Sequence, residues 1–470
     1  MRTTLERELK LEPDPQFVLP QDLGRPVESR LFISTYYDTP PRSLLRSGLT
    51  LRRRVENGLS RWQLKLPREG NARAELESPG GPAGPPHELR NLLAAHLRHG
   101  PLAPVATLRT RRVGVRVGDG EHELAEVTLD AVDVLDGQRQ AGAFRELEIE
   151  LLEGDDDDLD RLARVLRRAG AHRSDGRTKV ARALDLSFDG APPEDASPFE
   201  QLHALLRLQL RDIEAHDPGV RLGDDPEDVH RMRVATRRTR ALVQATRPLL
   251  GERLHPLADE LKWIGALLGS VRDLDVLIDR LRDGVAQLDD DRKGGDLLVA
   301  SLEEEREGCR DALLTALDSP RYLDTLALFE REVEALPRQG EADGLAPIAA
   351  EAFAKLRKQA KALPDVPSDA ELHELRKSVK KARYAAELAA GEGGRRVEKA
   401  IDGLKDLQDV IGAHQDAVVA EERLRALAKA RTALAAGRLI ERERERRRVA
   451  RAELPVLLDD VLGRGRKAFA

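Results

Sequence analysis

Polar and apolar residues alternate with a period of two in short segments over roughly the first 185 residues. Near the start, two glutamates and a lysine (Glu6, Glu8 and Lys10) alternate with residues that are mainly leucine. Side chains on a β-strand point alternately to opposite faces of the sheet. The alternation therefore predicts strands with one charged and one apolar face, separated by turn signals such as Asp136-Gly137.

Later segments repeat this charged face. Its charged positions are Arg52 and Arg54, then Arg61 and Lys65, then Arg73, Glu75 and Glu77, then Arg109 and Arg111, then Glu126 and Asp130, then Glu146, Glu148 and Glu150. A solvated face would alternate in the same way in any one strand, but it usually mixes Ser, Thr, Gln and Lys. Charges facing one another inside a closed barrel need ion pairs or a ligand. The set therefore favours a lumen that binds a compact, highly charged ligand.

The pattern changes near residue 190. Residues 189–197 are rich in Asp, Gly and Pro, and after them Leu, Ala, Arg and Glu recur with helical spacing to the C-terminus. A chain of 470 residues is too long for one ordinary core. We therefore predict an α+β multidomain protein, with a β-rich domain over residues 1–188, a linker over 189–197 and an all-helical domain over 198–470.

The helical half contains two copies of one basic helix. The first places His230, Arg233, Arg237 and Arg240 on one face, and the second places His373, Arg376, Lys380 and Arg383 in the same positions. The copies are 143 residues apart (373 − 230), and the same offset relates Asp273 to Asp416. A constant offset across separated motifs indicates a duplication. We expect two related bundles about a pseudo-twofold axis, with the basic helices facing a shared groove.

The ligand of this groove is expected to be a polyanion. The basic faces have few acidic residues at helical spacing, and a linear phosphate chain needs only charge and hydrogen-bond donors. Nucleic acid is disfavoured because aromatic residues, which stack on bases, make up only 3% of the chain. The paired histidines suit phosphate donors better than metal ligands, and no Cys/His spacing resembles a zinc site.

Composition adds limits on setting and partners. The net charge of −6 comes from 78 basic and 84 acidic residues, so any basic surface must be local. One cysteine, Cys309, allows no intrachain disulfide, and no apolar stretch approaches the roughly 20 residues that span a bilayer. We expect a cytoplasmic protein without membrane contact. The pattern leaves the oligomeric state open.

The ordered motifs of the first half resemble those of CYTH domains, the triphosphate tunnel metalloenzymes. They are Glu6-Arg7-Glu8-Leu9-Lys10, Tyr36-Tyr37-Asp38-Thr39-Pro40, Leu51-Arg52-Arg53-Arg54, Leu64-Lys65, Arg73-Ala74-Glu75-Leu76-Glu77, Glu146-Leu147-Glu148-Ile149-Glu150 and Lys179-Val180-Ala181-Arg182. The two basic helices, with Leu268-Gly269-Ser270-Val271-Arg272-Asp273, resemble a CHAD domain. The resemblance implies an eight-stranded antiparallel tunnel that binds triphosphate with Mg²⁺ or Mn²⁺, followed by a helical domain that binds inorganic polyphosphate. It also implies an association with polyphosphate granules. One departure is Gln415, which stands where the first copy has Arg272.

The resemblance also implies roles for individual residues. Metal ligands would be Glu6 and Glu8, with Asp130, Glu146 and Glu148 helping to hold metals or to position water. Triphosphate binders would be Lys10, Arg52, Arg54, Lys65, Arg109, Arg111 and Lys179. Catalytic candidates are Glu148, Glu146 and Lys10, with Glu148 chosen as the carboxylate that accepts a proton from water. Glu75 and Glu77 suit metal binding and the balancing of lumen arginines equally well.

These motifs leave more than one function open. The first is metal-dependent hydrolysis of inorganic triphosphate to diphosphate and phosphate, with a polyphosphate-binding helical domain. The alternatives are a non-catalytic protein that binds polyphosphate or triphosphate, and a hydrolase of another organic triphosphate such as thiamine triphosphate. Cyclisation of ATP is disfavoured because no adenine pocket is visible. The lumen carboxylates favour the enzyme, because phosphate binding alone would not need them.

Overall fold

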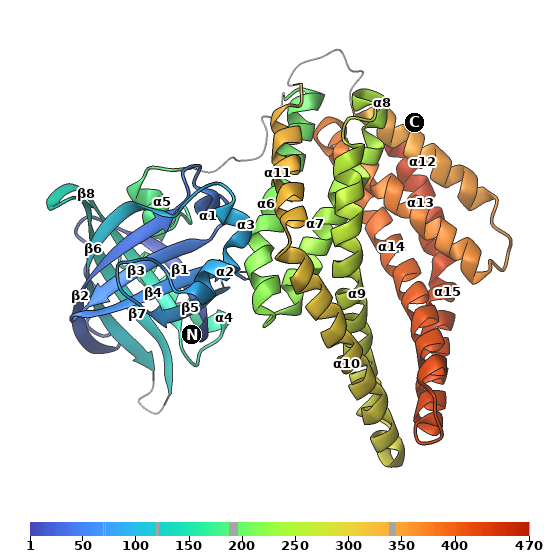
Figure 1. Cartoon of the computed structure of the whole chain (residues 1–470), viewed down its shortest axis with the longest axis horizontal. Coiled ribbons are helices and arrows are strands. Elements are labelled where there is room, and N and C mark those ends of the chain that lie inside the picture. Colours follow the sequence, from blue (N-terminus) through green and yellow to red (C-terminus); the bar gives the residue numbers. More distant parts are fainter. Residues whose placement is uncertain (69, 71, 119–121, 188–195, 338–344, 470) are drawn as a thin grey trace. The chain divides into compact units, whose positions relative to one another are not determined.

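The chain divides near residue 190 into two compact units (Figure 1). The computed structural model describes residues 1–68, 70, 72–118, 122–187, 196–337 and 345–469, except for the side chain of Glu392. Most of the predicted linker, residues 189–195, lies outside the described residues. Within the described chain, no helix has both the length and the apolar character needed to cross a membrane.

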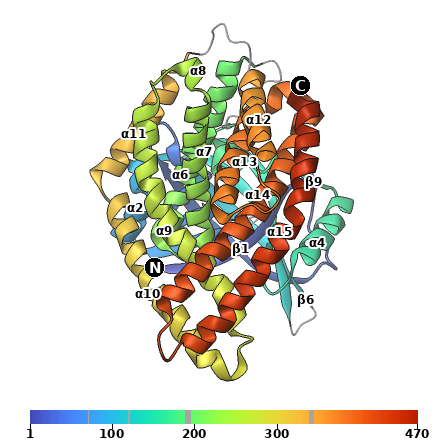
Figure 2. The same ribbon diagram turned by 90° about the vertical axis from the view of Figure 1, so that its right-hand side faces the viewer.

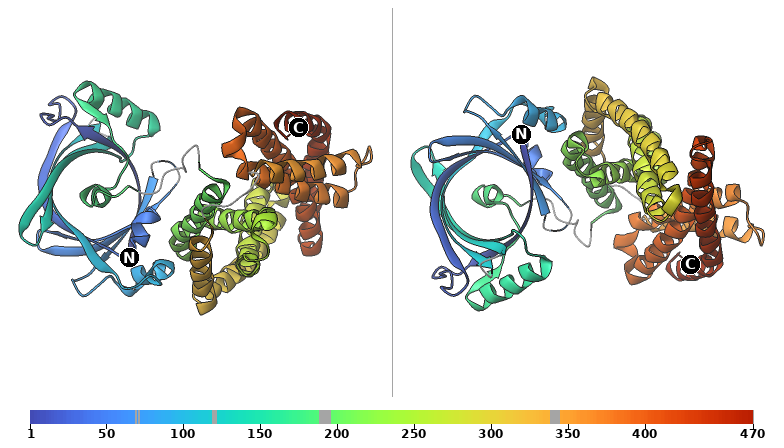
Figure 3. Two further views of the ribbon diagram at one scale, coloured as in Figure 1. Left: turned by 90° about the horizontal axis from the view of Figure 1, so that it is seen from above. Right: turned by 90° about the horizontal axis from the view of Figure 1, so that it is seen from below.

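The first unit contains a closed antiparallel barrel of eight strands, as predicted. In sequence order these are β1 Arg2–Pro13, β2 Arg25–Asp38, β3 Thr50–Glu56, β4 Leu59–Pro67, β5 Ala72–Pro79, β6 Ala103–Gly118, β7 Glu123–Asp136 and β8 Arg139–Leu151. Their spatial order is β5-β4-β3-β2-β6-β7-β8-β1, and pairing of β1 with β5 closes the ring. Figure 3 shows this ring end-on. A ninth short strand, β9 Ala171–Arg173, extends the sheet beside the end of β1.

The main core of this unit lies outside the barrel, under helix α4 (Asp156–Arg168). Asp155 begins this helix with a capping box, in which the Asp155 carboxylate accepts a hydrogen bond from the Asp158 amide. Apolar residues of the helix, such as Leu162 and Leu166, pack against outward-facing strand residues such as Ile149. Because the apolar face of these strands points outward to α4, their charged face must line the lumen.

The lumen itself changes from apolar at one end to charged at the other. The apolar end is filled by Val180 of helix α5 (Lys179–Ala183), which packs with Tyr36, Leu108 and Val132. The unit's other short helices are α1 (Ser43–Arg46), α2 (His87–Leu92) and α3 (Ala94–Leu97). Because α5 fills one end, the polar cavity described below occupies the remaining part of the barrel.

The second unit is entirely helical in its described residues (Figure 2). Its α-helices are α6 Pro198–Leu222, α7 Pro226–Ala245, α8 Arg247–Leu250, α9 His255–Val285, α10 Arg292–Leu317, α11 Pro320–Glu334, α12 Ala346–Lys361, α13 Asp369–Leu388, α14 Ala390–Leu427 and α15 Ala433–Phe469, with a 3₁₀ turn η1 at Asp289–Asp291. One core cluster contains residues of α9, α10, α14 and α15, and another contains residues of α12, α13, α14 and α15.

The helix boundaries follow the sequence repeat. Helices α7 and α13 both contain 20 residues, and both of their ends are 143 residues apart (369 − 226 and 388 − 245). Gly251 and Gly394 have the same offset and nearly the same backbone angles, φ 60° and ψ −140° against φ 56° and ψ −157°. This region of backbone space is open essentially only to glycine. The second unit therefore contains two related copies, with an equivalent glycine bend just before α9 in the first and near the start of α14 in the second.

Candidate functional site

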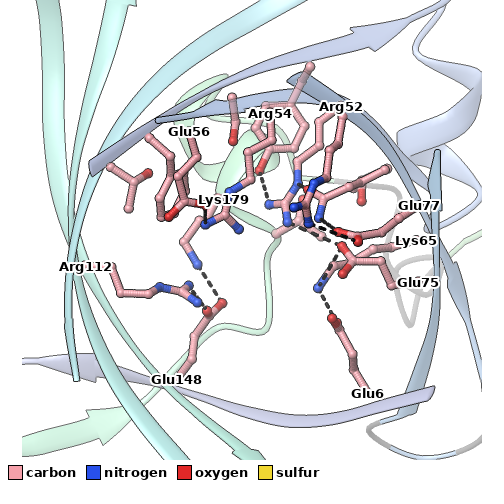
Figure 4. A pocket seen from close by; sticks show the side chains of 18 of the residues that line it. Glu6, Arg52, Arg54, Glu56, Lys65, Glu75, Glu77, Arg112, Glu148 and Lys179 are labelled. Carbon is pink, nitrogen blue, oxygen red and sulfur yellow. Dashed lines mark hydrogen bonds and ion pairs between the residues drawn. The ribbon is translucent and has the colours of Figure 1, made fainter. Parts of the chain in front are cut away.

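A cavity of about 390 Å³ occupies the charged part of the barrel lumen (Figure 4). Eight predicted site residues line it: Glu6, Glu8, Lys10, Arg52, Arg54, Lys65, Glu148 and Lys179. The wall also contains Arg61, Arg73, Glu75, Glu77 and Glu150 of the predicted charged face, and the structure adds Arg30, Glu56 and Arg112. The strand alternation thus brings most of the predicted lumen residues together around one small polar space.

One side of the cavity holds a close pair of carboxyl groups, Glu6 and Glu75. Burial raises the pKa of Glu6 to about 8 despite the nearby Lys65 ammonium, and a hydrogen bond with Glu75 contributes to the increase. Lys65 forms an ion pair with Glu6, and its Nζ lies 3.8 Å from a Glu75 oxygen. Hard divalent cations prefer carboxylate oxygens, so these two neighbouring carboxyl groups could both serve as ligands of such a cation.

The opposite side is organised around Glu148. Its Oε1 lies 2.9 Å from Lys10 Nζ and 2.6 Å from Lys179 Nζ, and its Oε2 accepts a 2.8 Å hydrogen bond from Arg112. Burial alone would raise the pKa of Glu148, but these three cations hold it well below the usual range. A carboxylate this strongly paired is a weak proton acceptor. The geometry therefore argues against the prediction that Glu148 is the base.

Glu150 is better suited than Glu148 to accept a proton. It lines the same cavity, and it has no ion pair within 4.0 Å among the residues that the structure describes. Burial raises its pKa, and the Lys65 and Arg112 charges oppose this increase only in part.

Asp130 and Glu146 were predicted to hold metals or water, and the structure corrects this placement. Both side chains are 0% exposed, and neither lies on the cavity wall. Asp130 accepts two 2.7 Å hydrogen bonds from Arg112, and Glu146 Oε1 lies 3.0 Å from Lys10 Nζ and 2.6 Å from Lys179 Nζ. The two carboxylates form a layer behind the cavity cations, so they act as buried counter-charges that fix those cations in place.

Arg109 and Arg111 were predicted to face the lumen, and this was also wrong. Both are exposed on the outside of β6, where Arg109 pairs with Asp133 at 2.7 Å, whereas Thr110 and Arg112 face inward. Val113 and Val115 share the parity of Arg109, and Val115 belongs to the outer core. This shared parity was the sequence signal that would have selected Arg112, since apolar residues of these strands point outward.

The lumen donors fit a divalent cation that keeps much of its water. Among the described residues, no group of three or more His, Cys, Asp or Glu side chains is arranged to enclose a metal. Mg²⁺ is usually held by one or two carboxylates together with substrate oxygens and water rather than by a full protein cage. Glu6 and Glu75 provide such a pair, and Glu8 lies nearby on the same face of β1.

The helical unit brings the two predicted basic faces side by side along α7 and α13. Arg233 and Arg237 of the first copy lie close enough to Lys380 of the second to influence its charge, together with Arg376. Burial and then these three arginines lower the pKa of Lys380 to about 7. In the described structure, no carboxylate lies within 4.0 Å of Arg237, Arg376 or Lys380. We call these four residues, Arg233, Arg237, Arg376 and Lys380, the basic groove.

The ends of the two basic helices are related but not identical. In the first copy Arg272 lies near His230, and burial together with this charge lowers the histidine pKa. In the second copy His373 Nδ1 lies 3.1 Å from Gln415 Oε1, at the equivalent position. At the other end, Arg240 is half-buried. Arg383 was predicted to face the groove, but it is 7% exposed, lies 3.6 Å from Glu387 and stacks on Tyr384.

Comparisons with known proteins identify both units. Residues 4–184 match the CYTH domain and residues 204–425 match the CHAD domain. A protein of two Mycobacterium tuberculosis strains, described as uncharacterized, is 32% identical over 427 residues, which cover 83% of this chain and 81% of that protein. The chain belongs to the family of CYTH–CHAD proteins. CYTH proteins include triphosphatases and cyclases, and the tunnel enzymes among them generally use divalent metals.

Solved structures are similar to each unit separately. The CHAD domain of the plant Ricinus communis is 27% identical with a TM-score of 0.45, covering 59% of this chain and 94% of that one. A Hippeastrum adenylyl cyclase homologue, described as having a dominant triphosphatase activity, is 16% identical with a TM-score of 0.26, covering 38% of this chain and 95% of that one.

The buried layer of the CYTH unit predicts that substitutions of two aspartates on the same strand will change the free energy of unfolding by different amounts. Asp130→Asn removes a buried counter-charge and leaves Arg112 and Lys179 underpaired, so it should lower the free energy of unfolding by about 3 kcal/mol. Asp133→Asn breaks the exposed pair with Arg109 and should change it by less than about 0.5 kcal/mol. Urea unfolding of the full chain, followed by circular dichroism, measures both. Equal effects would show that Asp130 is not a buried counter-charge.

Proposed function

We propose that the CYTH unit hydrolyses inorganic triphosphate to diphosphate and phosphate with the help of Mg²⁺ or Mn²⁺, and that the CHAD unit binds inorganic polyphosphate. The observation that carries the first part is the composition of the cavity wall. Lysines and arginines suited to phosphoryl oxygens surround a space of about 390 Å³ that also contains a close carboxyl pair. Two neighbouring carboxyl groups on the wall would repel a bound phosphate unless a cation lay between them, so the pair favours a metal-assisted site.

The cavity favours an inorganic substrate over an organic triphosphate. Its wall includes two aromatic residues, Phe32 and Tyr36, and one aliphatic residue, Leu59. Arg54 covers the Phe32 ring, the Tyr36 hydroxyl accepts a 3.3 Å hydrogen bond from Arg52, and Leu59 lies exposed beside the β3–β4 turn. These contacts leave little apolar surface for a base or a thiazole ring.

The proposed reaction assigns a separate task to each side of the cavity. Lys10, Lys179 and Arg112 would bind and orient the phosphoryl groups, because their positions are fixed by Asp130, Glu146 and Glu148. Glu6 and Glu75, with Glu8 nearby, would hold the cation. When bound, a divalent cation neutralises phosphoryl charge and lowers the pKa of a coordinated water. Arg52 and Arg54 would bind the oxygens that face the upper wall in Figure 4.

Polyphosphate binding by the CHAD unit is supported by the excess positive charge of the basic groove, in which Arg233 pairs with Asp273 at 3.2 Å but the other three residues have no carboxylate within 4.0 Å in the described structure. Arg233, Arg237, Arg376 and Lys380 crowd together from two repeats, and burial followed by the three arginine charges lowers the pKa of Lys380. A phosphate chain lying along both helices would relieve this repulsion, and it would release counterions. It would need no base-stacking surface.

Removing two lumen carboxylates should separate the two activities. In the variant Glu6→Ala with Glu8→Ala, metal-dependent phosphate release from triphosphate should fall by about 100-fold or more, because the metal-binding face of β1 is lost. Polyphosphate affinity, measured by calorimetry, should remain unchanged. Glu28→Ala, an exposed glutamate on β2, is the matched control. Release is measured with Mg²⁺, Mn²⁺ or EDTA, and inorganic triphosphate is compared with ATP, thiamine triphosphate and long-chain polyphosphate.

Two results of that assay would contradict the proposal. Undiminished release in the double variant would remove Glu6 and Glu8 from the metal site. If the wild-type chain released phosphate from none of these substrates but still bound polyphosphate, the chain would be a binding protein instead.

A charge-removal pair tests the groove. Arg233→Ala with Arg376→Ala should weaken polyphosphate binding by about tenfold or more and reduce the dependence of log affinity on log salt concentration by about two. The control variant, Arg231→Ala with Lys377→Ala, changes exposed basic residues on the same two helices that pair with Glu227 and Glu374. An equal loss in both variants would point to general charge attraction rather than to the groove.

Polyphosphate affinity should also depend on pH through Lys380. Its pKa is about 7 in the free protein because burial and then the charges of Arg376, Arg237 and Arg233 lower it, with Asp416 opposing them only in part. A bound anion raises this pKa, so binding takes up a proton once the pH exceeds about 7. Affinity should therefore fall by up to about tenfold per pH unit above that value. Lys380→Arg stays charged and should remove this component. The same pH profile in the variant would exclude Lys380.

A further inference from the structure

We propose that Phe32 is a positioning residue of the cavity, whose ring holds Arg54 and Arg112 in place for triphosphate. This inference rests on the proposed function, because it assumes that the two arginines contact the phosphoryl groups. Phe32 lines the polar cavity, yet its side chain is only 4% exposed. The Cζ atoms of Arg54 and Arg112 lie 3.6 Å and 5.7 Å from the centre of its ring.

The sheet topology explains why one ring contacts both arginines. Strand β2 lies between β3 and β6 in the barrel. On these neighbours Phe32 is opposite Glu56 and Thr110, and Arg54 and Arg112 each lie two residues from those positions. Residues two apart on a strand share a face, so both arginines are diagonal neighbours of the ring on the lumen side. Phe32 is therefore the side chain between the two guanidinium groups.

Arg54 needs such support because it lies in a crowd of like charges. Burial lowers its pKa to about 10, and Arg52, Arg112 and Arg30 add to this decrease. Its one ion pair within 4.0 Å in the described structure is with Glu56, at 2.8 Å, and its buried Nε has no hydrogen-bond partner. An arginine with so few polar partners would otherwise move away from the cluster.

An aromatic ring suits this task better than a carboxylate. The face of the ring attracts a guanidinium through its quadrupole, with most benefit where water is excluded. The ring has no net charge, so it neither neutralises the arginine nor repels phosphate. Stacking also leaves the N–H groups in the plane of the guanidinium free to donate to phosphoryl oxygens. A glutamate at position 32 would hold the arginines equally close but would weaken the site for an anion.

The test replaces Phe32 in the full chain by mono-, di- and trifluorinated phenylalanine. Fluorine draws electron density from the ring and weakens its attraction for cations stepwise, while the shape of the ring changes little. Triphosphate affinity, measured by calorimetry with Mg²⁺, should fall at each step, and the total loss should be roughly tenfold for the trifluorinated ring. Phe32→Trp should retain affinity and Phe32→Leu should lose at least as much as the trifluorinated ring. The same changes should appear mainly in KM rather than in kcat.

The matched control is the same fluorinated series at Phe144. Arg182 Cζ lies 5.6 Å from the centre of that ring, and neither residue lines the cavity. Triphosphate affinity should be constant across this series. Constant affinity across the Phe32 series would show that the ring only fills space, and would overturn the inference while leaving the proposed function intact. A wild-type chain that binds no triphosphate would overturn the proposed function, and this role of Phe32 with it.

Discussion

The structure of the CYTH unit depends on how it tolerates charge inside a barrel. An ion moved from water into a protein interior loses several kcal/mol of solvation, which only good partners restore. Asp130 and Glu146, both fully buried, provide those partners for Arg112, Lys10 and Lys179. The main apolar core lies on the outer face, under α4, because charged side chains occupy much of the inner face. The fold is therefore an inverted barrel, polar within and apolar beneath its covering helix.

The CHAD unit meets the same constraint in a different way. Its basic groove contains Arg237, Arg376 and Lys380 without a close carboxylate in the described structure, so the repulsion is only partly relieved. The four side chains of the groove are half-buried, so solvent screens part of their mutual repulsion. The duplication supplies one half of the charge from each copy, through α7 and α13.

The sequence predicted the properties that depend on periodicity. Alternation gave the charged lumen around Glu6, Glu8 and Lys10, and the constant offset gave the paired basic helices, whose boundaries repeat after the same number of residues. It failed where periodicity was ambiguous or incomplete. Consecutive Arg111 and Arg112 allow either parity when taken alone, and the outward parity of Val113 and Val115 was the one signal that Arg112 faces inward, where it pairs with Asp130. Alternation also predicts which face of the sheet a side chain lies on, but not how far it lies from the cavity. For this reason Asp130 and Glu146 were mistaken for cavity residues.

The distance of a side chain from the cavity also separates two kinds of residue. Some line the cavity and can contact a ligand, and others lie behind them and fix their positions. Glu148 touches the cavity and three cations at once, whereas Glu146, two residues earlier on the same face, contacts two of those cations from behind. Such a layer restricts the ammonium groups before any substrate arrives, so the entropy of ordering them is lost during folding rather than during binding. The ring of Phe32 extends this principle to Arg54 by attraction without neutralisation. A site for a small polyanion can therefore be rigid and still keep a large part of its positive charge available.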